Sequence, residues 1–298
     1  MRAAAILGLG CSQKDLNPFQ SDAQVQWRLG MPASPDEADV VLLFGGDGTI
    51  HRHLGQLVRL GLPVLIVPAG SGNDFARALE MLRVRDSLAG WKKFCADAGN
   101  AHAIDLGVIH PMAPGVSTPP KKYFCCVAGV GLDGEVARRA NQLPRWLRGN
   151  GGYALTLALT IFTFAPFSMK ITTPSDDPSV GGNWVERSRR PTILAAFANT
   201  PVYGGGMKIA PQAKMDDGLL DVCVVAAVNR LKLLSVFPTV YAGKHLKVRE
   251  VEYFQAPKVR VETEHPLDVY ADGEFVCQTP VEISTQRAAL KVVTPRSG

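Results

Sequence analysis

The sequence predicts an α/β domain followed by a second domain rich in β-strands. Two short apolar runs, residues 40–44 and 64–67, have the continuous hydrophobicity of strands buried on both faces. Each ends in a glycine-rich turn, and a helical pattern follows each turn, over residues 50–60 and 75–82. Strand, turn and helix in repetition are typical of parallel α/β units.

After about residue 105 the pattern changes to short β-rich runs separated by turns. These runs cover residues 123–127, 192–197, 219–225, 258–261, 267–270, 275–277 and 289–293. The spacing predicts a mostly antiparallel β-sandwich. Two helical segments interrupt it, near 134–163 and 230–242, and stretches rich in Pro, Ser and Gly predict loops over 111–121 and 174–190.

We therefore expect a Rossmann-like nucleotide-binding domain over residues 1–107 and a β-sandwich domain over residues 108–298. The last strand, about 286–298, is a candidate to return to the first domain. Residues 3–9 are read as a first buried strand and not as the core of a signal peptide, since the apolar stretch is at the lower length limit for one.

Composition narrows the classes of function. The chain has 298 residues and a net charge of +5, which suits an anionic partner such as a nucleotide or an acidic membrane but is too small to indicate nucleic acid. The six cysteines form no C-x-x-C pair, which predicts reduced thiols and a cytoplasmic protein. The apolar stretch 153–169 contains three threonines and a proline, so it predicts a buried or lipid-facing helix and not a spanning one.

The first glycine-rich turn consists of Gly45, Gly46, Asp47, Gly48 and Thr49, between a buried strand and a helix. Glycines let a backbone approach a phosphate closely, and a helix N-terminus offers N–H groups and the positive end of its dipole. The turn is not a Walker A loop, because no Gly-Lys-Ser/Thr follows. A tight structural turn would explain an Asp-Gly pair alone, but the whole cluster favours a phosphate-binding loop.

The second turn, residues 70–77, reads Gly-Ser-Gly-Asn-Asp-Phe-Ala-Arg and follows its strand in the same way. Ser71 can donate a hydrogen bond to a phosphate, and Asn73 or Asp74 can cap the helix. Capping alone would account for the Asn-Asp pair, so this turn by itself is only suggestive.

A third motif, Asp272-Gly273-Glu274, lies between two strand-like runs. Asp-Gly is a strong signal for a two-residue hairpin, which explains the first two residues and says nothing of Glu274. Phosphoryl transfer needs a carboxylate that accepts the hydroxyl proton, and a rigid hairpin tip would hold one. The residues alone leave a structural turn and a catalytic acid equally open.

Taken together, these motifs resemble the catalytic domain of diacylglycerol kinases and their bacterial soluble relatives, a group that includes sphingosine and ceramide kinases. Further stretches carry the resemblance in the same order along the chain, at residues 104–107, 129–133, 203–211, 215–222 and 272–274. It extends over roughly residues 40–295.

The resemblance implies ATP held between two domains, with the phosphates near residues 46–52, which include Arg52, and near Ser71 and Asn73. It also implies a structural Mg²⁺, bound by the Asp217 carboxylate and the main-chain oxygens of Lys214 and Leu219. The acid pair Asp272 and Glu274 resembles the family's catalytic residues, Glu274 having the usual assignment as base.

Two departures from the family pattern leave the ATP contacts open. The family has an Asn-Pro-x-Ser/Ala-Gly turn after its first strand, whereas this chain has Gly-Leu-Gly-Cys-Ser at residues 8–12, and its first helix is shortened or lost. The usual Asn-Glu after the first glycine-rich turn is replaced by His51-Arg52. His51 and His53 are about 200° apart on a helix, so they are not expected to share a metal ion.

The implied activity is an ATP-dependent lipid kinase, with diacylglycerol preferred and ceramide or a sphingoid base as the alternative acceptor. NAD kinase shares the Gly-Gly-Asp-Gly turn but fits the second turn and the hairpin poorly. A lipid-binding relative without catalysis is a further alternative, because the N-terminal motif is missing.

The expected partner is a lipid at a membrane surface, with peripheral contact at the cytoplasmic face of the inner membrane; no nucleic acid is expected, and a homodimer is left open. Residues 136–150 contain no acidic residue and are the predicted contact. Their basic and aromatic members are Arg138, Arg139, Arg145, Trp146 and Arg148.

Overall fold

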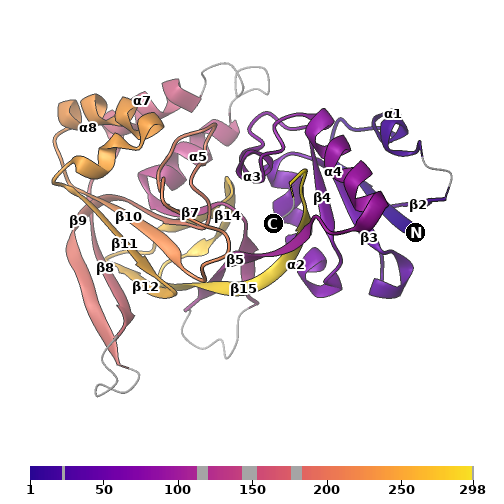
Figure 1. The fold of residues 1–298 in the computed structure, drawn as a ribbon. Helices are drawn as coiled ribbons and strands as arrows, with labels where there is room; N and C mark the ends of the chain where they lie inside the picture. The colour runs from indigo at the N-terminus through magenta and orange to yellow at the C-terminus, as the bar shows by residue number, and fades with distance from the viewer. Residues whose placement is uncertain (22–23, 113–119, 143–152, 176–182, 297–298) are drawn as a thin grey trace. The chain divides into compact units, whose positions relative to one another are not determined.

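The computed structural model describes residues 1–21, 24–112, 120–142, 153–175 and 183–296 (Figure 1). The chain forms two compact units, one of residues 1–106 with 287–298 and one of residues 107–286. Both boundaries fall inside long strands, β5 (Ala101–Pro111) and β15 (Val281–Val293). These two strands therefore belong partly to each unit.

The first unit contains a parallel sheet in the order β4-β3-β1-β2. The end of β15 joins it beside β4, where Val292 pairs with Val64 in parallel. All residues of β3 and β4 are buried, as their continuous apolar sequences predict. The strands are β1 (Arg2–Leu7), β2 (Gln26–Leu29), β3 (Val40–Gly45) and β4 (Val64–Pro68).

Short helices connect these strands. The connection after β1 is a single helical turn followed by a 3₁₀ turn, so the first helix is indeed shortened. The helix after β3 begins three residues earlier than predicted, and the helix after β4 ends at Ala78, where the prediction continued to residue 82. The elements are α1 (Gln13–Leu16), η1 (Asn17–Phe19), η2 (Pro35–Glu37), α2 (Asp47–Leu60), α3 (Asp74–Ala78) and α4 (Val84–Asp97).

An aromatic cluster anchors the short connection after β1. Phe19 is fully buried and packs edge-to-face on Phe44, with ring centroids 5.3 Å apart. The indole N–H of Trp91 in α4 donates to the carbonyl oxygen of Phe19 at 2.9 Å. These contacts fix the connection although its helix has only four residues.

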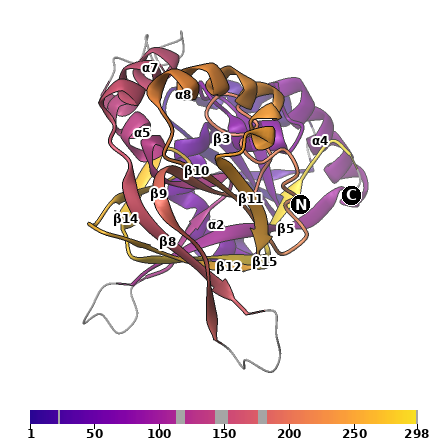
Figure 2. The ribbon, with the colours of Figure 1, turned by 90° about the vertical axis from the view of Figure 1, so that its left-hand side faces the viewer.

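The second unit is built from antiparallel strands. They follow the order β14-β13-β7-β9-β8-β12-β15, while β10 pairs with β9 and β11 (Figure 2). Alternate residues of these strands form a core of apolar side chains. The strands are β6 (Lys122–Phe124), β7 (Val127–Gly131), β8 (Phe167–Pro174), β9 (Trp184–Ala198), β10 (Leu220–Ala226), β11 (Val251–Ala256), β12 (Lys258–Thr263), β13 (Asp268–Ala271) and β14 (Glu274–Gln278).

The prediction of a loop over residues 174–190 is wrong at its C-terminal end, because β9 already begins at Trp184. This part of β9 pairs with β8 and carries charged side chains in place of an apolar alternation. The guanidinium of Arg260 lies 3.7 Å from the centre of the Trp184 ring, and Arg189 forms an ion pair with Glu186 at 2.8 Å. A solvent-facing ribbon held by such pairs resembles a loop in composition.

Helices lie on one side of the strands of the second unit, as both views show (Figures 1 and 2). They occupy the two predicted helical segments, although residues 143–152 lie outside the described part of the chain. Among the residues that the structure describes, no helix is both long and apolar enough to cross a membrane. The elements are α5 (Leu132–Gln142), α7 (Tyr153–Thr163), α8 (Arg230–Val236), η5 (Phe237–Ala242) and η6 (Lys244–Lys247).

The Ile-Asp-Leu-Gly motif at residues 104–107 has a packing role in β5. The buried Asp105 carboxylate accepts the backbone N–H of Ala288 in β15 at 2.8 Å. Gly107 pairs with Phe124 of β6, and a Cβ atom at Gly107 would lie only 2.0 Å from Cζ of that ring. Glycine is required here because the aromatic ring covers the backbone.

Gly107→Ala should therefore lower the free energy of unfolding by about 1–3 kcal/mol, since the buried Phe124 ring must leave its rotamer. Gly55→Ala is the matched control. Nothing lies within 4 Å of a Cβ at Gly55 in α2, so that change should stabilise the protein by about 0.5–1 kcal/mol. Urea denaturation of both variants measures the difference, and equal stabilities would contradict the packing role.

Candidate active site

The carboxyl ends of β1 and β3 form the topological switch point of the first unit. The chain leaves β1 toward β2 on one side, whereas β3 and then β4 lie on the other. In open parallel sheets, ligands bind in the crevice outside such a switch point. The glycine-rich turns after β1 and β3 lie at this edge of the sheet, and so does the turn after β4.

Thr49 packs against the turns after β1 and β3. A Cβ atom at Gly8 would lie 2.8 Å from Thr49 Oγ1, and one at Gly45 would lie 2.7 Å from Thr49 Cβ. The backbone N–H of Gly8 also donates to the carbonyl oxygen of Phe44 at 2.7 Å. Gly8 was not among the predicted site residues, although a glycine directly after a buried strand is the signal that identifies it.

The turns after β3 and β4 touch through their backbones. A Cβ atom at Gly70 would lie 2.5 Å from Gly46 Cα, and one at Gly46 would lie 2.8 Å from Gly70 Cα. Asn73 holds the second turn closed, because its Oδ1 accepts from Gly70 N at 2.8 Å and its Nδ2 donates to Gly70 O at 2.7 Å. Asn73 was predicted to contact nucleotide, and in the structure its side chain makes these two hydrogen bonds to the backbone of its own turn.

Asp47 ties the two turns together. Its carboxylate accepts the backbone N–H of Asp74 at 3.0 Å and of Phe75 at 3.1 Å, at the start of α3. The sequence allowed a cap by Asn73 or Asp74, but Asn73 occupies the N-cap position without a side-chain cap hydrogen bond. The cap comes from 27 residues earlier in the chain.

The remaining predicted residues of the first unit differ in exposure. Ser71 and Arg52 are exposed, whereas Gly48 is half-buried at the start of α2. His53 contacts Gln56 through its ring nitrogen at 3.4 Å. Within the described ranges, no three side chains of His, Cys, Asp or Glu come together as a metal site.

In the second unit, the Asp-Gly motif forms the predicted hairpin between β13 and β14. Ala271 pairs with Glu274, and Asp272 and Gly273 have φ of 52° and 84°. The Asp272 carboxylate accepts backbone N–H groups from Cys125 and Cys126, both at 2.8 Å, and from Val127 at 3.3 Å. Asp272 therefore fastens the hairpin tip to the segment between β6 and β7.

Glu274 differs from Asp272 in its surroundings. It is the first residue of β14, an edge strand, and its side chain is exposed. The next residue, Phe275, packs edge-to-face on Tyr270 with ring centroids 5.8 Å apart. The hairpin thus presents one carboxylate to solvent from a backbone that Asp272 and the aromatic pair hold in place.

The predicted metal ligands lie in a turn before β10. Asp217 is half-buried, and its Oδ1 accepts the backbone N–H of Leu219 at 3.0 Å. Asp221, in β10, is fully buried, and burial raises the pKa of its carboxyl group. Tyr253 and Gln255 of β11 donate hydrogen bonds to Asp221. Carboxylate and main-chain oxygens are the types of donor that hard cations such as Mg²⁺ prefer, so the predicted ligands fit such an ion in their chemistry.

A glycine turn brings two cavity residues together. Tyr203 and Met207 exchange backbone hydrogen bonds of 3.0 and 2.9 Å across Gly204, Gly205 and Gly206. All three glycines have positive φ, at 57°, 83° and 102°, a backbone that other residues rarely adopt. The motif at residues 203–211, which carries part of the family resemblance, therefore places the side chains of Tyr203 and Met207 on the wall of a cavity.

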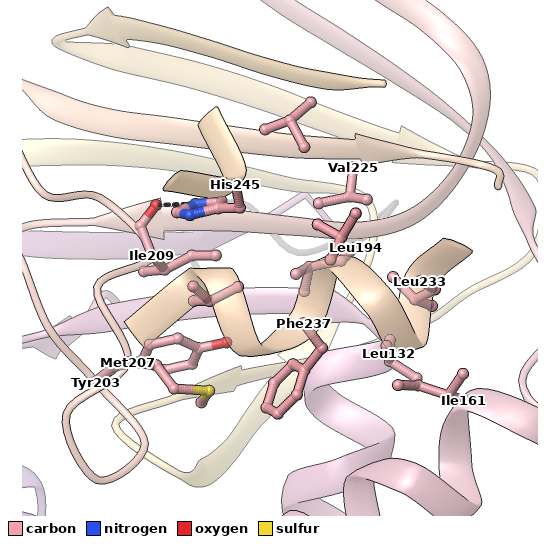
Figure 3. Close-up of a pocket in the computed structure, with 13 residues that line it drawn as sticks. Leu132, Ile161, Leu194, Tyr203, Met207, Ile209, Val225, Leu233, Phe237 and His245 are labelled. Carbon is pink, nitrogen blue, oxygen red and sulfur yellow. Dashed lines mark hydrogen bonds between the residues drawn. The ribbon is translucent and has the colours of Figure 1, made fainter. Parts of the chain in front are cut away.

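That cavity, of about 620 Å³, lies within the second unit between the sheet and the helices (Figure 3). Its wall is apolar except for Tyr203 and His245. Burial lowers the pKa of His245, whose Nε2 lies 3.1 Å from the Ile209 carbonyl oxygen, so the ring is neutral near pH 7. Other wall residues come from α5, α7, β9, β10, α8 and η5, namely Leu132, Ile161, Leu194, Val225, Leu233 and Phe237.

Comparison with known proteins agrees with both units. The family description "Diacylglycerol kinase catalytic domain" matches residues 19–109. The description "YegS C-terminal NAD kinase beta sandwich-like domain" matches residues 126–294, more than half of the chain. The predicted fold class, an α/β domain followed by a β-sandwich domain, is confirmed.

Two curated relatives extend the match over most of the chain. A diacylglycerol kinase of Mycobacterium tuberculosis strain H37Rv is 35% identical over 260 residues, which cover 87% of this chain and 78% of the relative. A probable YegS-like lipid kinase of Chromohalobacter salexigens is 30% identical over 258 residues, which cover 83% of this chain and 73% of the relative.

Solved structures share the fold. A putative diacylglycerol kinase from Bacillus anthracis superposes with a TM-score of 0.71 at 21% identity, covering 98% of this chain and 94% of the other. An NAD kinase from Archaeoglobus fulgidus in complex with ATP gives a TM-score of 0.54 at 16% identity, covering 100% and 94%.

The fold and the family matches define the class as a phosphotransferase. The chain belongs to the diacylglycerol kinase catalytic-domain family and is a lipid kinase, which confirms the resemblance read from the motifs.

The contact between Gly46 and Gly70 gives a first prediction for this site. Gly70→Ala should weaken binding of an ATP analogue by at least about tenfold, because the new Cβ must push the two turns apart. Isothermal titration measures the affinity, and Gly55→Ala in the same unit is the control that should leave it unchanged. Wild-type affinity in the Gly70 variant would mean that the turns serve the fold alone.

The hydrogen bonds of the Asp272 carboxylate give a second prediction for the site. Asp272→Ala should lower the free energy of unfolding by about 1–3 kcal/mol, because partly buried N–H groups lose their acceptor. Glu274→Ala, two residues away on the exposed side, should stay within about 0.5 kcal/mol of wild type. Chemical denaturation compares the two, and an equal loss in both variants would contradict the assignment of Asp272 as a fastener.

Proposed function

We propose that this kinase transfers the γ-phosphate of ATP to the hydroxyl group of diacylglycerol. The apolar cavity of the second unit is the observation that carries the proposal. Its wall is apolar apart from Tyr203 and His245, and an apolar lining with a few polar groups is typical of ligand pockets. The relative from Mycobacterium tuberculosis, at 35% identity, has the name diacylglycerol kinase and supports the same acceptor.

The wall of the cavity also discriminates between acceptors. It contains no acidic side chain, and its one histidine is neutral near pH 7. A sphingoid base would bring an ammonium group, which is costly to bury without an anionic partner. An NAD acceptor would need polar partners that an apolar wall does not provide. Uncharged acyl chains are satisfied by apolar contact alone, which favours diacylglycerol, with ceramide as the remaining alternative.

The two units would supply different parts of the reaction. In the first unit, the glycine-rich turns and the start of α2 would bind the phosphates with backbone N–H groups, and Ser71 and Arg52 are exposed donors. In the second unit, Glu274 would accept the proton of the lipid hydroxyl. A structural Mg²⁺ would be held by Asp217 and the main-chain oxygens of Lys214 and Leu219. The Mg²⁺ that accompanies ATP would neutralise negative charge on the phosphates.

The lipid substrate implies work at a membrane surface, and we place the protein at the cytoplasmic face of the inner membrane. Of the predicted contact segment, Arg138 and Arg139 are described and both bind Glu135, with nitrogen–oxygen distances of 2.6 Å. Glu135 thus offsets part of their positive charge. Arg145, Trp146 and Arg148 lie outside the described residues.

One assay tests the acceptor directly. Purified protein with radiolabelled ATP and Mg²⁺ is offered diacylglycerol, ceramide, sphingosine and NAD in separate reactions, the lipids in mixed micelles. We expect label on diacylglycerol above all others. Label on ceramide would move the assignment to the alternative, label on NAD would overturn the lipid acceptor, and no label at all would favour a relative without catalysis.

Glu274→Gln tests the base. Turnover should fall by roughly 10²–10⁴-fold, because the amide cannot accept the hydroxyl proton, while affinity for an ATP analogue stays at the wild-type value. Steady-state kinetics on diacylglycerol and calorimetry measure the two quantities. Phe275→Leu, at the next exposed position, is the control for a general disturbance of the hairpin. Near-wild-type turnover in the Glu274 variant would remove this residue from the mechanism.

A further inference from the structure

Helix α7 is apolar on more than one face. No charged residue lies between Arg148 and Lys170, a stretch that contains the whole helix. Thr156, Thr160 and Ile161 are buried, and the Thr160 hydroxyl donates to its own helix at the Thr156 carbonyl oxygen, at 2.6 Å. A helix that is apolar around its circumference is usually buried in protein or in contact with lipid.

Among the described residues, two side chains of α7 are exposed. Leu159 and Phe162, which are three positions apart and so share a face, are 58% and 48% exposed. Helix α8 lies beside α7 in both views, and its Leu231 is 77% exposed (Figures 1 and 2). We call Leu159, Phe162 and Leu231 the α7–α8 apolar surface.

The segment that contains α8 is basic. From residue 222 to residue 249 the chain has five basic residues and no acidic one, and all five are exposed. Arg230 directly precedes Leu231 in α8, and Lys232 follows it and forms an ion pair with Glu250 at 2.7 Å. The other three are Lys244, Lys247 and Arg249.

The same helices form the wall of the apolar cavity. Ile161 faces the cavity while its neighbour Phe162 is exposed, and Leu233 faces it two positions after the exposed Leu231 (Figure 3). A second cavity, of about 340 Å³, shares Leu132, Ile161 and Leu233 with the first. The apolar surface and the cavity are therefore two sides of one helical layer.

From this arrangement we propose that the α7–α8 apolar surface docks onto an anionic lipid bilayer, with Arg230 beside it in contact with lipid phosphates. The proposal rests on the proposed function, because the cavity behind the surface would receive the lipid from that bilayer. Exposed apolar residues gain by entering the interface, and neighbouring basic residues gain from the anionic surface.

Charge favours a bilayer over a second copy of the chain. A twofold dimer would place this surface against itself, so that each positive segment faced its own copy. Like charges in contact oppose association, whereas anionic headgroups complement them. The interior of a membrane is also apolar like the cavity wall behind this surface, whereas a polar protein surface is not.

The test is co-sedimentation of the full chain with large vesicles, either of pure phosphatidylcholine or with added phosphatidylglycerol. The triple variant Leu159→Ser, Phe162→Ser and Leu231→Ser should lose at least about tenfold in affinity for the anionic vesicles. Arg230→Glu should lose about fivefold or more on anionic vesicles and little on phosphatidylcholine.

The control replaces two leucines of the first unit with matching exposure, Leu29→Ser with Leu82→Ser, at 49% and 57% exposed. It should bind vesicles like wild type. Circular dichroism and thermal melting check that the triple variant is folded, as expected for exposed positions. Turnover of a short-chain, water-soluble diacylglycerol separates loss of docking from loss of catalysis. The triple variant should turn over this substrate like wild type, because docking is not needed for it.

Several outcomes would overturn the docking surface. Wild type that does not bind anionic vesicles, a folded triple variant that binds within twofold of wild type, or an equal loss in the leucine control would each do so. A dimer in sedimentation equilibrium that the triple variant dissociates, with vesicle binding intact, would make this surface an interface between copies. If vesicle binding behaves as expected but wild type phosphorylates no lipid, the proposed function fails and the docking surface stands.

Discussion

The arrangement of the first unit depends on the carboxylate of Asp47. Helix α3 has only five residues, too few to be stable alone, and its first N–H groups need an acceptor outside the helix. Asp47 supplies that acceptor from the preceding strand–helix turn, at 3.0 and 3.1 Å. The hydrogen bonds hold the turns after β3 and β4 together where Gly46 and Gly70 touch, and the edge of the sheet with its exposed Ser71 takes its shape from them.

Asp272 does in the second unit what Asp47 does in the first. Each carboxylate belongs to a glycine-containing turn, and each accepts backbone N–H groups from a segment that is distant in the sequence. Geometry thus divides the acidic residues of the sequence motifs into those that accept backbone hydrogen bonds and those that face solvent. Glu274 is in the second group, and Asp217 combines a local hydrogen bond to Leu219 with an oxygen set suited to a cation.

Local signals predicted much of the fold, and non-local contacts explain what was missed. The buried strands β3 and β4 and the Asp-Gly hairpin follow from patterns a few residues long. The hydrogen bond from Cys125 to Asp272 spans 147 positions and leaves no periodic trace in the sequence. The start of β9 was hidden because its charged side chains have partners distant in the sequence, such as Glu252 of β11, which forms an ion pair with Arg190 at 2.7 Å. The cavity could not be predicted because its wall combines residues from many separate segments.

The cavity and the main core of the second unit lie on opposite faces of the same strands. In β9, Ala195 and Phe197 belong to the core and Leu194 to the cavity; in β10, Val222 and Val224 belong to the core and Val225 to the cavity. No residue of the cavity wall is a member of that core. Substitutions in the cavity wall can therefore change the shape of the cavity while the packing of the main core on the other face is preserved. Their cost in stability falls on the separate cluster in which Leu132, Ile161 and Leu233 pack the helices together.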